Sequence, residues 1–90
     1  MIEVRLAAPL RPLVGGADIL DVDGNDLAEV INNLETPYPG FREQLLESTG
    51  NIKRFIYIFR NAEDVRSLEG IKTRLNEGDV VLIFPAIAGG

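Results

Sequence analysis

The stretch Asp26-Leu27-Ala28-Glu29-Val30-Ile31-Asn32-Asn33-Leu34 decides the fold, because its period is plainly helical. The large apolar residues Leu27, Val30, Ile31 and Leu34 fall at i, i+3, i+4 and i+7, which places them on one face of a helix. Asp26 followed by Glu29 has the spacing of a capping box, and capping explains this carboxylate pair without acid–base chemistry. The helix is expected to end near Thr36, because Pro37 disfavours helical angles in the residue before it.

Two strands are predicted before this helix. Residues 2–6 alternate apolar and charged side chains, which is typical of a strand with one buried and one solvated face. Residues 8–16 carry two prolines and a glycine pair, so we expect an irregular connection there. Residues 19–22 predict a second strand, closed by the turn at residues 23–25. A hairpin is the simplest join between the two strands.

Shorter elements are predicted after the helix. Residues 41–46 permit a second, short helical segment. Aromatic and β-branched runs, or short runs bounded by turn residues, then predict strands at 55–59, 64–66 and 80–84. We expect Pro85 to stop regular pairing after the last strand, because proline lacks the amide hydrogen that a ladder uses.

The order of these elements predicts the fold class. A hairpin, a helix and further strands give an α+β fold with a mixed four- to five-stranded sheet packed on one main helix, the order of a ubiquitin-like β-grasp. A generic α+β domain is the alternative. The 90 residues are enough for one domain, so we predict a single β-grasp domain over 1–90 with a flexible C-terminal Gly-Gly tail at 86–90.

Composition narrows the function. The chain has no cysteine and no histidine, so thiolate metal sites, thiol nucleophiles and the commonest acid–base residue are absent, and we expect neither a bound metal nor independent catalysis. Fourteen acidic against nine basic residues give a formal charge of −5, which disfavours nucleic acid as a partner. The longest apolar run, residues 80–84, is too short to span a membrane, and the first residues do not resemble a signal peptide, so we expect a cytoplasmic protein.

The last residues are the candidate reactive group. Ala88-Gly89-Gly90 follows the last strand, and glycine can thread a channel too narrow for side chains while leaving the carboxylate of Gly90 unhindered. Four residues, 87–90, span roughly 13 Å when extended, enough to enter a partner's active site. A frayed polar end is the alternative.

A docking surface is predicted beside the tail. If Ile56 and Ile58 face the helix, alternation puts their neighbours on the opposite sheet face, where an apolar patch on a small domain usually marks a contact site. Acidic residues near it, such as Glu63 and Asp79, are interpreted as a solvated rim that tunes association. The predicted partner-binding residues are Gly89, Ala88, Ile87, Phe84, Leu82, Phe59, Tyr57 and Phe55.

The chain resembles the ubiquitin-like sulfur carriers of the ThiS/MoaD family over nearly its whole length. The tail from Phe84 to Gly90 is similar to the family's strand, proline, short apolar stretch and terminal Gly-Gly. Leu10-Arg11-Pro12 with Gly15-Gly16, and residues 63–66 with Leu68 and Gly70, are similar to its CysO-like subgroup.

The resemblance implies a carrier that is a co-substrate and not an enzyme. It implies that an E1-like adenylating and sulfurtransferase enzyme uses ATP to activate Gly90, that a sulfur donor converts this glycine to a thiocarboxylate, and that the carrier itself binds no cofactor. The implied recipient is a sulfur-accepting biosynthetic enzyme, with a cysteine synthase-like enzyme favoured and the large subunit of molybdopterin synthase as runner-up. Thiamine synthesis comes third. A protein modifier joined to lysines through Gly90 is a second hypothesis, and a plain interaction domain is a third.

Overall fold

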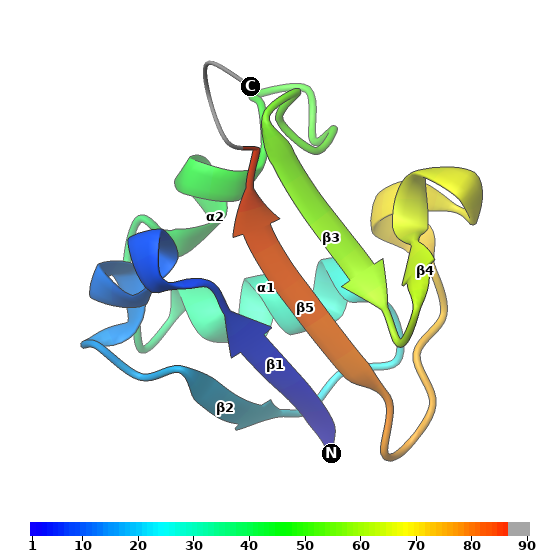
Figure 1. Ribbon diagram of the computed structural model, residues 1–90, viewed down its shortest axis with the longest axis horizontal. Coiled ribbons are helices and arrows are strands. Elements are labelled where there is room, and N and C mark those ends of the chain that lie inside the picture. Colours follow the sequence, from blue (N-terminus) through cyan, green and yellow to red (C-terminus); the bar gives the residue numbers. More distant parts are fainter. Residues whose placement is uncertain (87–90) are drawn as a thin grey trace.

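The two central strands of the sheet are β1 (Ile2–Leu6) and β5 (Val80–Pro85), which run parallel and come from opposite ends of the chain. The computed structural model describes residues 1–86 and shows one mixed five-stranded sheet, in the order β2-β1-β5-β3-β4, with its helices on one face (Figure 1). The predicted β-grasp is therefore confirmed. The remaining strands are β2 (Ile19–Val22), β3 (Ile56–Arg60) and β4 (Glu63–Asp64).

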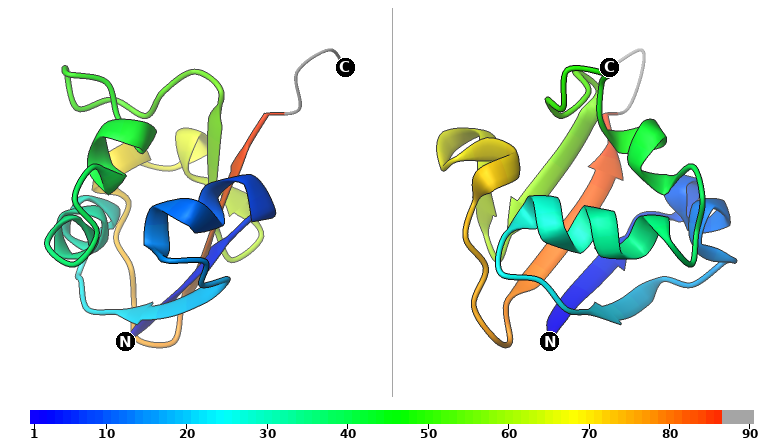
Figure 2. Two further views of the ribbon diagram at one scale, coloured as in Figure 1. Left: turned by 90° about the vertical axis from the view of Figure 1, so that its left-hand side faces the viewer. Right: turned by 180° about the vertical axis from the view of Figure 1, so that it is seen from behind.

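Helix α1 (Leu27–Glu35) crosses the inner face of the sheet as the 3.6-residue period predicts (Figure 2). Its four apolar residues are all buried, with exposures of 0 to 3%. The Asp26 carboxylate accepts a hydrogen bond from the N–H of Glu29 at 2.8 Å, which confirms the predicted N-cap. The Glu29 carboxylate reaches back to the N–H of Asn25 at 3.1 Å, one residue earlier than the usual capping box.

Helix α2 (Phe41–Leu45) follows α1 and places Phe41 and Leu45 in the core. Its first turn is held by a side chain from the previous helix, since the two carboxylate oxygens of Glu35 accept hydrogen bonds from the N–H groups of Gly40 and Arg42, each at 2.8 Å. These two backbone hydrogen bonds lower the pKa of Glu35, because they favour the charged carboxylate.

The connection between β1 and β2 is more regular than predicted. It contains a 3₁₀ helix, η1 (Ala8–Val14), where the prolines and glycines predict an irregular segment. Proline fixes φ near the helical value, so Pro9 and Pro12 are compatible with a tight helical turn. Leu10 and Val14 point into the core, which gives the segment a reason to coil. Strands β1 and β2 do pair antiparallel, as expected of the hairpin, across this longer link.

Two strand boundaries also differ from the prediction. Strand β3 begins at Ile56 and not at Phe55. The strand predicted at 64–66 is wrong except at Asp64, because β4 covers only residues 63–64 and the chain then turns into the 3₁₀ helix η2 (Val65–Ser67). The cause is local: the Asp64 carboxylate accepts a hydrogen bond from the N–H of Arg66 at 2.9 Å and so caps a helical turn. A further 3₁₀ turn, η3 (Gly70–Lys72), follows before β5.

Pro85 does not stop regular pairing, which corrects the expectation drawn from its missing amide hydrogen. It lies within β5 opposite Ile56, and the next residue, Ala86, still donates its N–H to the carbonyl of Phe55 at 2.7 Å. Backbone groups alternate between the two sides of a strand, so the nitrogen of Pro85 faces the carbonyl of Ala7, which already accepts a hydrogen bond from the N–H of Leu10 at 2.9 Å. The proline therefore breaks no ladder hydrogen bond.

Candidate functional site

The candidate site begins where β5 ends, at the root of the C-terminal tail. Ala86 is the last described residue and is hydrogen-bonded to Phe55, so the sheet holds the chain up to that point. The predicted reactive and tail residues lie outside the described residues and stay predictions: Gly90, Gly89, Ala88 and Ile87.

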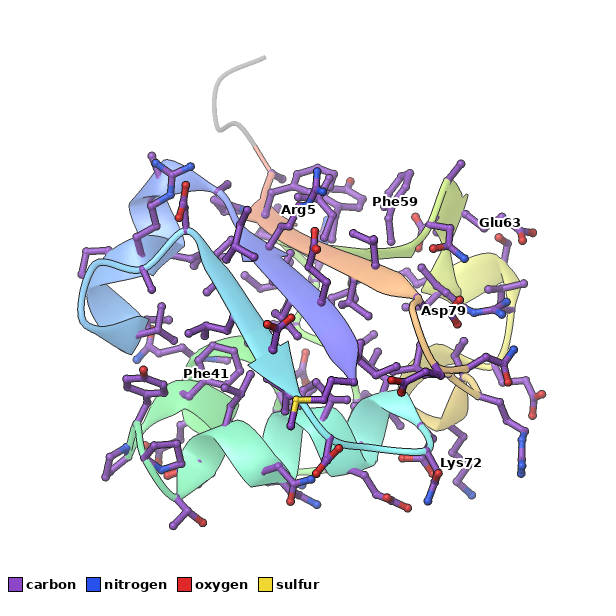
Figure 3. All side chains as sticks on the ribbon, turned by 90° about the horizontal axis from the view of Figure 1, so that it is seen from below. Arg5, Phe41, Phe59, Glu63, Lys72 and Asp79 are labelled. Carbon is purple, nitrogen blue, oxygen red and sulfur yellow. The ribbon has the colours of Figure 1, made fainter. Side chains whose placement is uncertain are left out.

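The two faces of the sheet near this root separate as the alternation predicts. Ile56, Ile58, Val81 and Ile83 point toward α1 and are at most 7% exposed. The neighbouring residues in the same two strands lie on the outer face, opposite the face that the helices cover. In Figure 3, Arg5 and Phe59 lie on that outer side, whereas Phe41 lies on the helix side. The outer residues next to the root are Phe55, Tyr57, Phe59, Leu82 and Phe84.

We call these outer residues the aromatic surface, because three of them pack ring against ring. Phe84 of β5 stacks on Tyr57 of β3, with ring centroids 5.5 Å apart, and lies 5.6 Å from the ring of Phe59. Leu82 is 37% exposed beside them, and Phe55 is 65% exposed at the end where the tail leaves. Tyr57, Phe59 and Phe84 are half-buried, so the surface combines half-buried rings with two exposed apolar side chains. Such a group on so small a domain is typical of a surface that a partner buries.

Arginines border this surface, which the sequence reasoning missed. The guanidinium of Arg66 lies 5.4 Å from the Tyr57 ring, and its Nη2 donates a hydrogen bond to the carbonyl of Lys53 at 2.7 Å. The guanidinium of Arg54 lies 5.3 Å from the ring of Phe55. A cation over an aromatic face is attracted by the ring quadrupole. The spacing of Arg54 beside Phe55 was visible in the sequence, but the Arg66–Tyr57 contact depends on the η2 turn.

Two hollows flank the end of β5. One, of about 500 Å³, is lined by Ala7, Pro9, Phe84, Pro85 and Ala86. The other, of about 430 Å³, lies on the β3 side and is lined mostly by apolar atoms. A partner that receives the tail therefore meets apolar recesses at its root. The second hollow is lined by Gln44, Glu47, Lys53, Arg54, Phe55, Ile56 and Pro85.

Asp79 is a turn residue and not part of the solvated rim that the sequence suggested. Its side chain is only 13% exposed and accepts hydrogen bonds from Arg60 Nε at 2.9 Å and from the N–H of Asn76 at 2.8 Å. Burial by itself raises the pKa of Asp79, but the hydrogen bonds from Asn76, Arg60 and Asn61 outweigh it, so the pKa lies below its usual value. Glu77, beside it, pairs with the N-terminal ammonium of Met1.

The rest of the described chain offers little other chemistry. Among residues 1–86 there is no group of three or more acidic side chains placed to hold a metal ion. No helix in that same part is long and apolar enough to cross a membrane. The aromatic surface and the tail root are thus the features that the site must be built on.

The fold and this surface define a ubiquitin-like β-grasp protein whose outer aromatic surface lies beside Ala86, the last described residue. The chain belongs to the ThiS family, whose model matches residues 4–90. It is 41% identical over 91 residues to the sulfur carrier protein CysO of Mycobacterium tuberculosis, with 99% of this chain and 98% of that protein covered. It is therefore a homologue of that sulfur carrier, as the tail and the internal motifs predict.

Two further comparisons agree on the fold and widen the range of relatives. The chain is 35% identical over 92 residues to small archaeal modifier protein 3 of Haloferax volcanii, covering 99% of this chain and 98% of that protein. Its structure superimposes on a chain of the Amycolatopsis orientalis BexX/CysO complex with a TM-score of 0.93 and 31% identity, and all of both chains is covered. The CysO of that organism thus forms a crystalline complex with BexX.

Proposed function

We propose that this protein is a sulfur carrier that delivers sulfur from a thiocarboxylate on Gly90. The observation that carries the proposal is the aromatic surface, whose central ring, Phe84, belongs to β5, the strand that leads into the Gly89-Gly90 tail. The match to the ThiS family extends through residue 90 and supports the same assignment. In this role the chain is a co-substrate of partner enzymes and supplies no catalytic side chain of its own.

The chemistry needs a partner because a free carboxylate is a poor electrophile. An oxygen of the Gly90 carboxylate attacks the α-phosphorus of ATP, pyrophosphate leaves, and an acyl-adenylate forms. Hydrosulfide (HS⁻) then attacks the carbonyl carbon and AMP leaves, so that the sulfur remains on Gly90 as a thiocarboxylate. The absence of cysteine and histidine is consistent with this scheme, since the ATP site and the sulfur source belong to other proteins.

The activating partner is proposed to dock on the aromatic face while the tail enters its active site. Phe84, Tyr57 and Phe59 supply rigid apolar area, which is the composition that binding hot spots favour. The hollow between Pro9 and Phe84 lies at the root of the tail and offers a recess for a partner side chain. Because the face and the root adjoin, one partner can cover both.

Cysteine biosynthesis is the favoured destination of the sulfur. Whole-length identity to a sulfur carrier protein named CysO supports a recipient of the cysteine synthase type, which would accept the sulfur onto an activated serine. A MoaD-type role with the large subunit of molybdopterin synthase is the runner-up.

A protein modifier is the second candidate, and the similarity to small archaeal modifier protein 3 specifically favours it. In that role the amine of a lysine on a target protein attacks the Gly90 carbonyl and forms an isopeptide bond, and the leaving group is AMP from the acyl-adenylate or hydrosulfide from the thiocarboxylate. The first step is shared with the carrier role, so the two differ only in what attacks the activated carbonyl.

The deciding experiment is an intact mass spectrum of the protein isolated from its native host and again after incubation with its activating enzyme, ATP and a sulfide source. The mass of a carrier is expected to rise by the difference between one sulfur and one oxygen atom, and fragmentation should locate this change at Gly90. A variant lacking Gly90 and a variant with one alanine appended after Gly90 are expected to gain nothing, while their circular dichroism matches the parent.

Each other result has a defined meaning. Conjugates linked through Gly90 to lysine, with no thiocarboxylate, would move the modifier to first place. Sulfur gained equally by the variant lacking Gly90 would refute both roles for this residue.

A further inference from the structure

The outer edge of β2 is open. The sheet order places β2 at one end, paired only with β1, so the described part of the chain lays no strand along its other side. The opposite end of the sheet is different, because β4 is only two residues long and turns directly into η2. Unpaired edges of this kind are templates for a further strand.

The backbone groups on this edge can be assigned from the register. The N–H of Leu6 donates to the carbonyl of Asp18 at 2.9 Å, so the backbone N–H and C=O groups of Asp18 point toward β1. By alternation, the backbone groups of Leu20 and Val22 point toward β1 as well. Ile19 and Asp21 therefore direct their N–H and C=O groups away from the sheet. The carbonyl of Asp23, next along the edge, accepts a hydrogen bond from Asn33 Nδ2 at 2.8 Å, so the row ends there.

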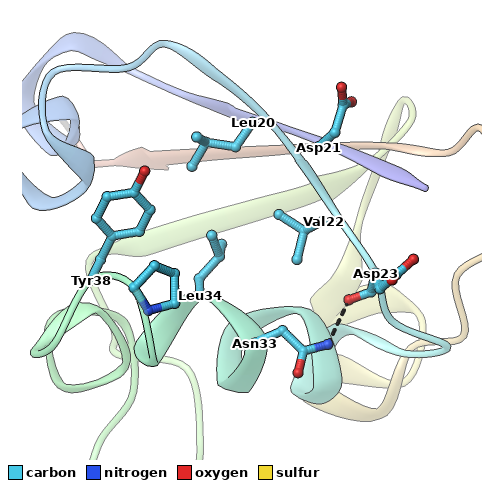
Figure 4. Close-up of a pocket in the computed structure, with 8 residues that line it drawn as sticks. Leu20, Asp21, Val22, Asp23, Asn33, Leu34 and Tyr38 are labelled. Atoms are coloured by element: carbon cyan, nitrogen blue, oxygen red, sulfur yellow. Dashed lines mark hydrogen bonds between the residues drawn. The ribbon is translucent and has the colours of Figure 1, made fainter.

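A hollow of about 520 Å³ lies under this edge, between β2 and the end of α1. Figure 4 shows Leu20, Val22, Leu34 and Tyr38 lining it, with Asp21 directed to the other side of the strand. A strand added beside β2 would place every second side chain toward this hollow and the alternate ones beside Asp21, because side chains alternate between faces. Small or branched apolar residues at alternate positions of the added strand would therefore fit the hollow.

Charge is distributed very unevenly around this edge. Residues 12–41, which include β2 and α1, contain six acidic residues and no lysine or arginine. The remaining chain has eight acidic and nine basic residues, so the net charge of −5 comes entirely from this segment (−6 against +1). The six acidic residues are Asp18, Asp21, Asp23, Asp26, Glu29 and Glu35.

The negative charge around β2 favours a basic segment over a second copy of the chain as the strand that binds this edge. A second copy of the chain pairing through β2 would bring Asp21 of each copy near acidic residues of the other, and like charges across a strand pair are destabilising. A segment with lysine or arginine at alternate positions would instead place its positive charges on the face of Asp21 and Asp23, which by alternation is opposite to the hollow.

We propose that β2 binds an extended segment of a partner protein by strand addition, and that the segment alternates apolar residues with lysine or arginine. Main-chain hydrogen bonds to Ile19 and Asp21 supply affinity, and the hollow and the acidic residues supply selection. The edge is separated from β5 by β1, so it is distinct from the aromatic face and goes beyond the sulfur-carrier role. A partner could hold β2 while the tail is in use.

The test uses the full chain and an acetylated peptide in which valine and lysine alternate. We expect the peptide to slow hydrogen exchange of the Ile19 and Asp21 amides, measured by NMR, because these N–H groups become hydrogen-bonded. A peptide of the same composition, with all valines preceding all lysines, serves as the matched control and is expected to leave both amides unprotected.

Variants separate backbone pairing from charge. Asp21→Pro removes one outward N–H and leaves the pairing with β1 intact, so peptide affinity should fall about fivefold. Asp21→Lys combined with Asp23→Lys should weaken binding about tenfold at low salt. The control for charge is Glu43→Lys with Glu69→Lys, two exposed positions outside this segment, which should leave affinity unchanged within about twofold.

Several results would overturn the proposal. They are equal protection by the two peptides, protection confined to amides outside β2, self-association of the chain through β2, and no binding at millimolar peptide. If Asp21→Pro fails to fold, the lysine variants and the exchange measurement on the parent chain still decide the matter.

Discussion

The ring of Phe84 lies stacked on the ring of Tyr57, with centroids 5.5 Å apart and planes inclined by 22°, and the same two residues are direct cross-strand partners of β5 and β3. Strand pairing and ring packing therefore both hold Phe84 in place, two residues before Ala86. Arg66 covers the other ring of this pair, since its guanidinium lies 5.4 Å from Tyr57. The root of the tail leaves the sheet from a position that these contacts fix.

Phe84→Ala should weaken binding of the activating enzyme about tenfold or more, because truncating a central aromatic residue of an interface removes most of its contact area. The cost to the free energy of unfolding should be about 1–3 kcal/mol, because Phe84 loses two ring pairs, each on the scale of about 1 kcal/mol, together with some buried area. Calorimetric titration with the activating enzyme measures the first quantity, and urea unfolding measures the second.

Ile19→Ala is the matched control for this substitution. Ile19 is also a large exposed side chain, at 49% exposure, but it belongs to β2, across β1 from the tail strand. Unchanged affinity for Phe84→Ala, or an equal loss for Ile19→Ala, would contradict a docking face centred on the aromatic residues.

Gly24→Ala should destabilise the fold by about 1–3 kcal/mol, the usual cost of forcing extra atoms into a packed site. A Cβ at Gly24 would lie 2.6 Å from Cγ2 and 2.9 Å from the backbone N of Val30, so helix α1 would have to shift. Urea unfolding gives the change in stability.

The comparison with Gly15 shows whether the close approach is the cause. Gly15 has φ of 65°, and no described atom lies within 4 Å of the position that a Cβ would take there, so its requirement is for backbone conformation only. Asparagine tolerates that conformation, so Gly15→Asn should be almost neutral, whereas Gly24→Asn should cost at least as much as Gly24→Ala. Equal effects at the two positions would rule out the proposed contact with Val30.

Most of the fold could be predicted because its signals are local. The period of residues 27–34 predicts α1, and alternation predicts which side of β3 and β5 faces the helix. The predictions were wrong where a distant contact decides the local structure. The segment between β1 and β2 forms a 3₁₀ helix because this conformation buries Leu10 and Val14 in the core. Pro85 stays paired because its nitrogen faces the already bonded carbonyl of Ala7, which only the register reveals.

The aromatic part of the site could be predicted for the same reason, whereas its borders could not. Phe84 and Tyr57 follow from alternation along two strands, but the position of Arg66 depends on the turn that Asp64 caps. The charge of Asp79 alone predicts a solvated position, because its hydrogen-bond partner Arg60 lies 19 residues away in the sequence. Contacts between such separated polar groups leave no periodic signal in the sequence.

Glu35→Gln should loosen the start of α2 and reduce the dependence of stability on acid. The folded pKa of Glu35 is lowered, so its carboxylate adds stability that is complete above about pH 5 and is lost as the pH falls through the folded pKa. Urea unfolding at pH 7 and at pH 3 should therefore show a smaller difference for Glu35→Gln than for the parent chain. Part of the difference should remain, because the pKa of Asp79 is lowered too.

Glu43→Gln provides the control for the charge change, since Glu43 is an exposed residue of the same helix and is not the side chain that bonds Gly40 and Arg42. It should leave the pH dependence of stability as in the parent. An equal flattening by both substitutions would assign the effect to general charge and not to the two backbone hydrogen bonds.

Pro85→Ala should have little effect on stability and sulfur loading, whereas Ala86→Pro should lower both, although the two substitutions exchange the same residue types at adjacent positions. The nitrogen of Pro85 faces the carbonyl of Ala7, which already accepts a hydrogen bond from Leu10, so an added N–H there gains no free ladder partner and the free energy of unfolding should change by less than about 1 kcal/mol. Ala86 donates its N–H to Phe55 at 2.7 Å, so proline at that position removes the last hydrogen bond before the tail, at a cost of about 1 kcal/mol. Exchange of the Tyr57 amide, which faces Phe84 in the next hydrogen-bonded pair of the same ladder, should quicken in Ala86→Pro alone. Sulfur loading at Gly90 should fall with it, because the tail no longer leaves the sheet from a fixed point. Both substitutions having the same effect on loading would show that the activating enzyme does not depend on how the sheet holds the root.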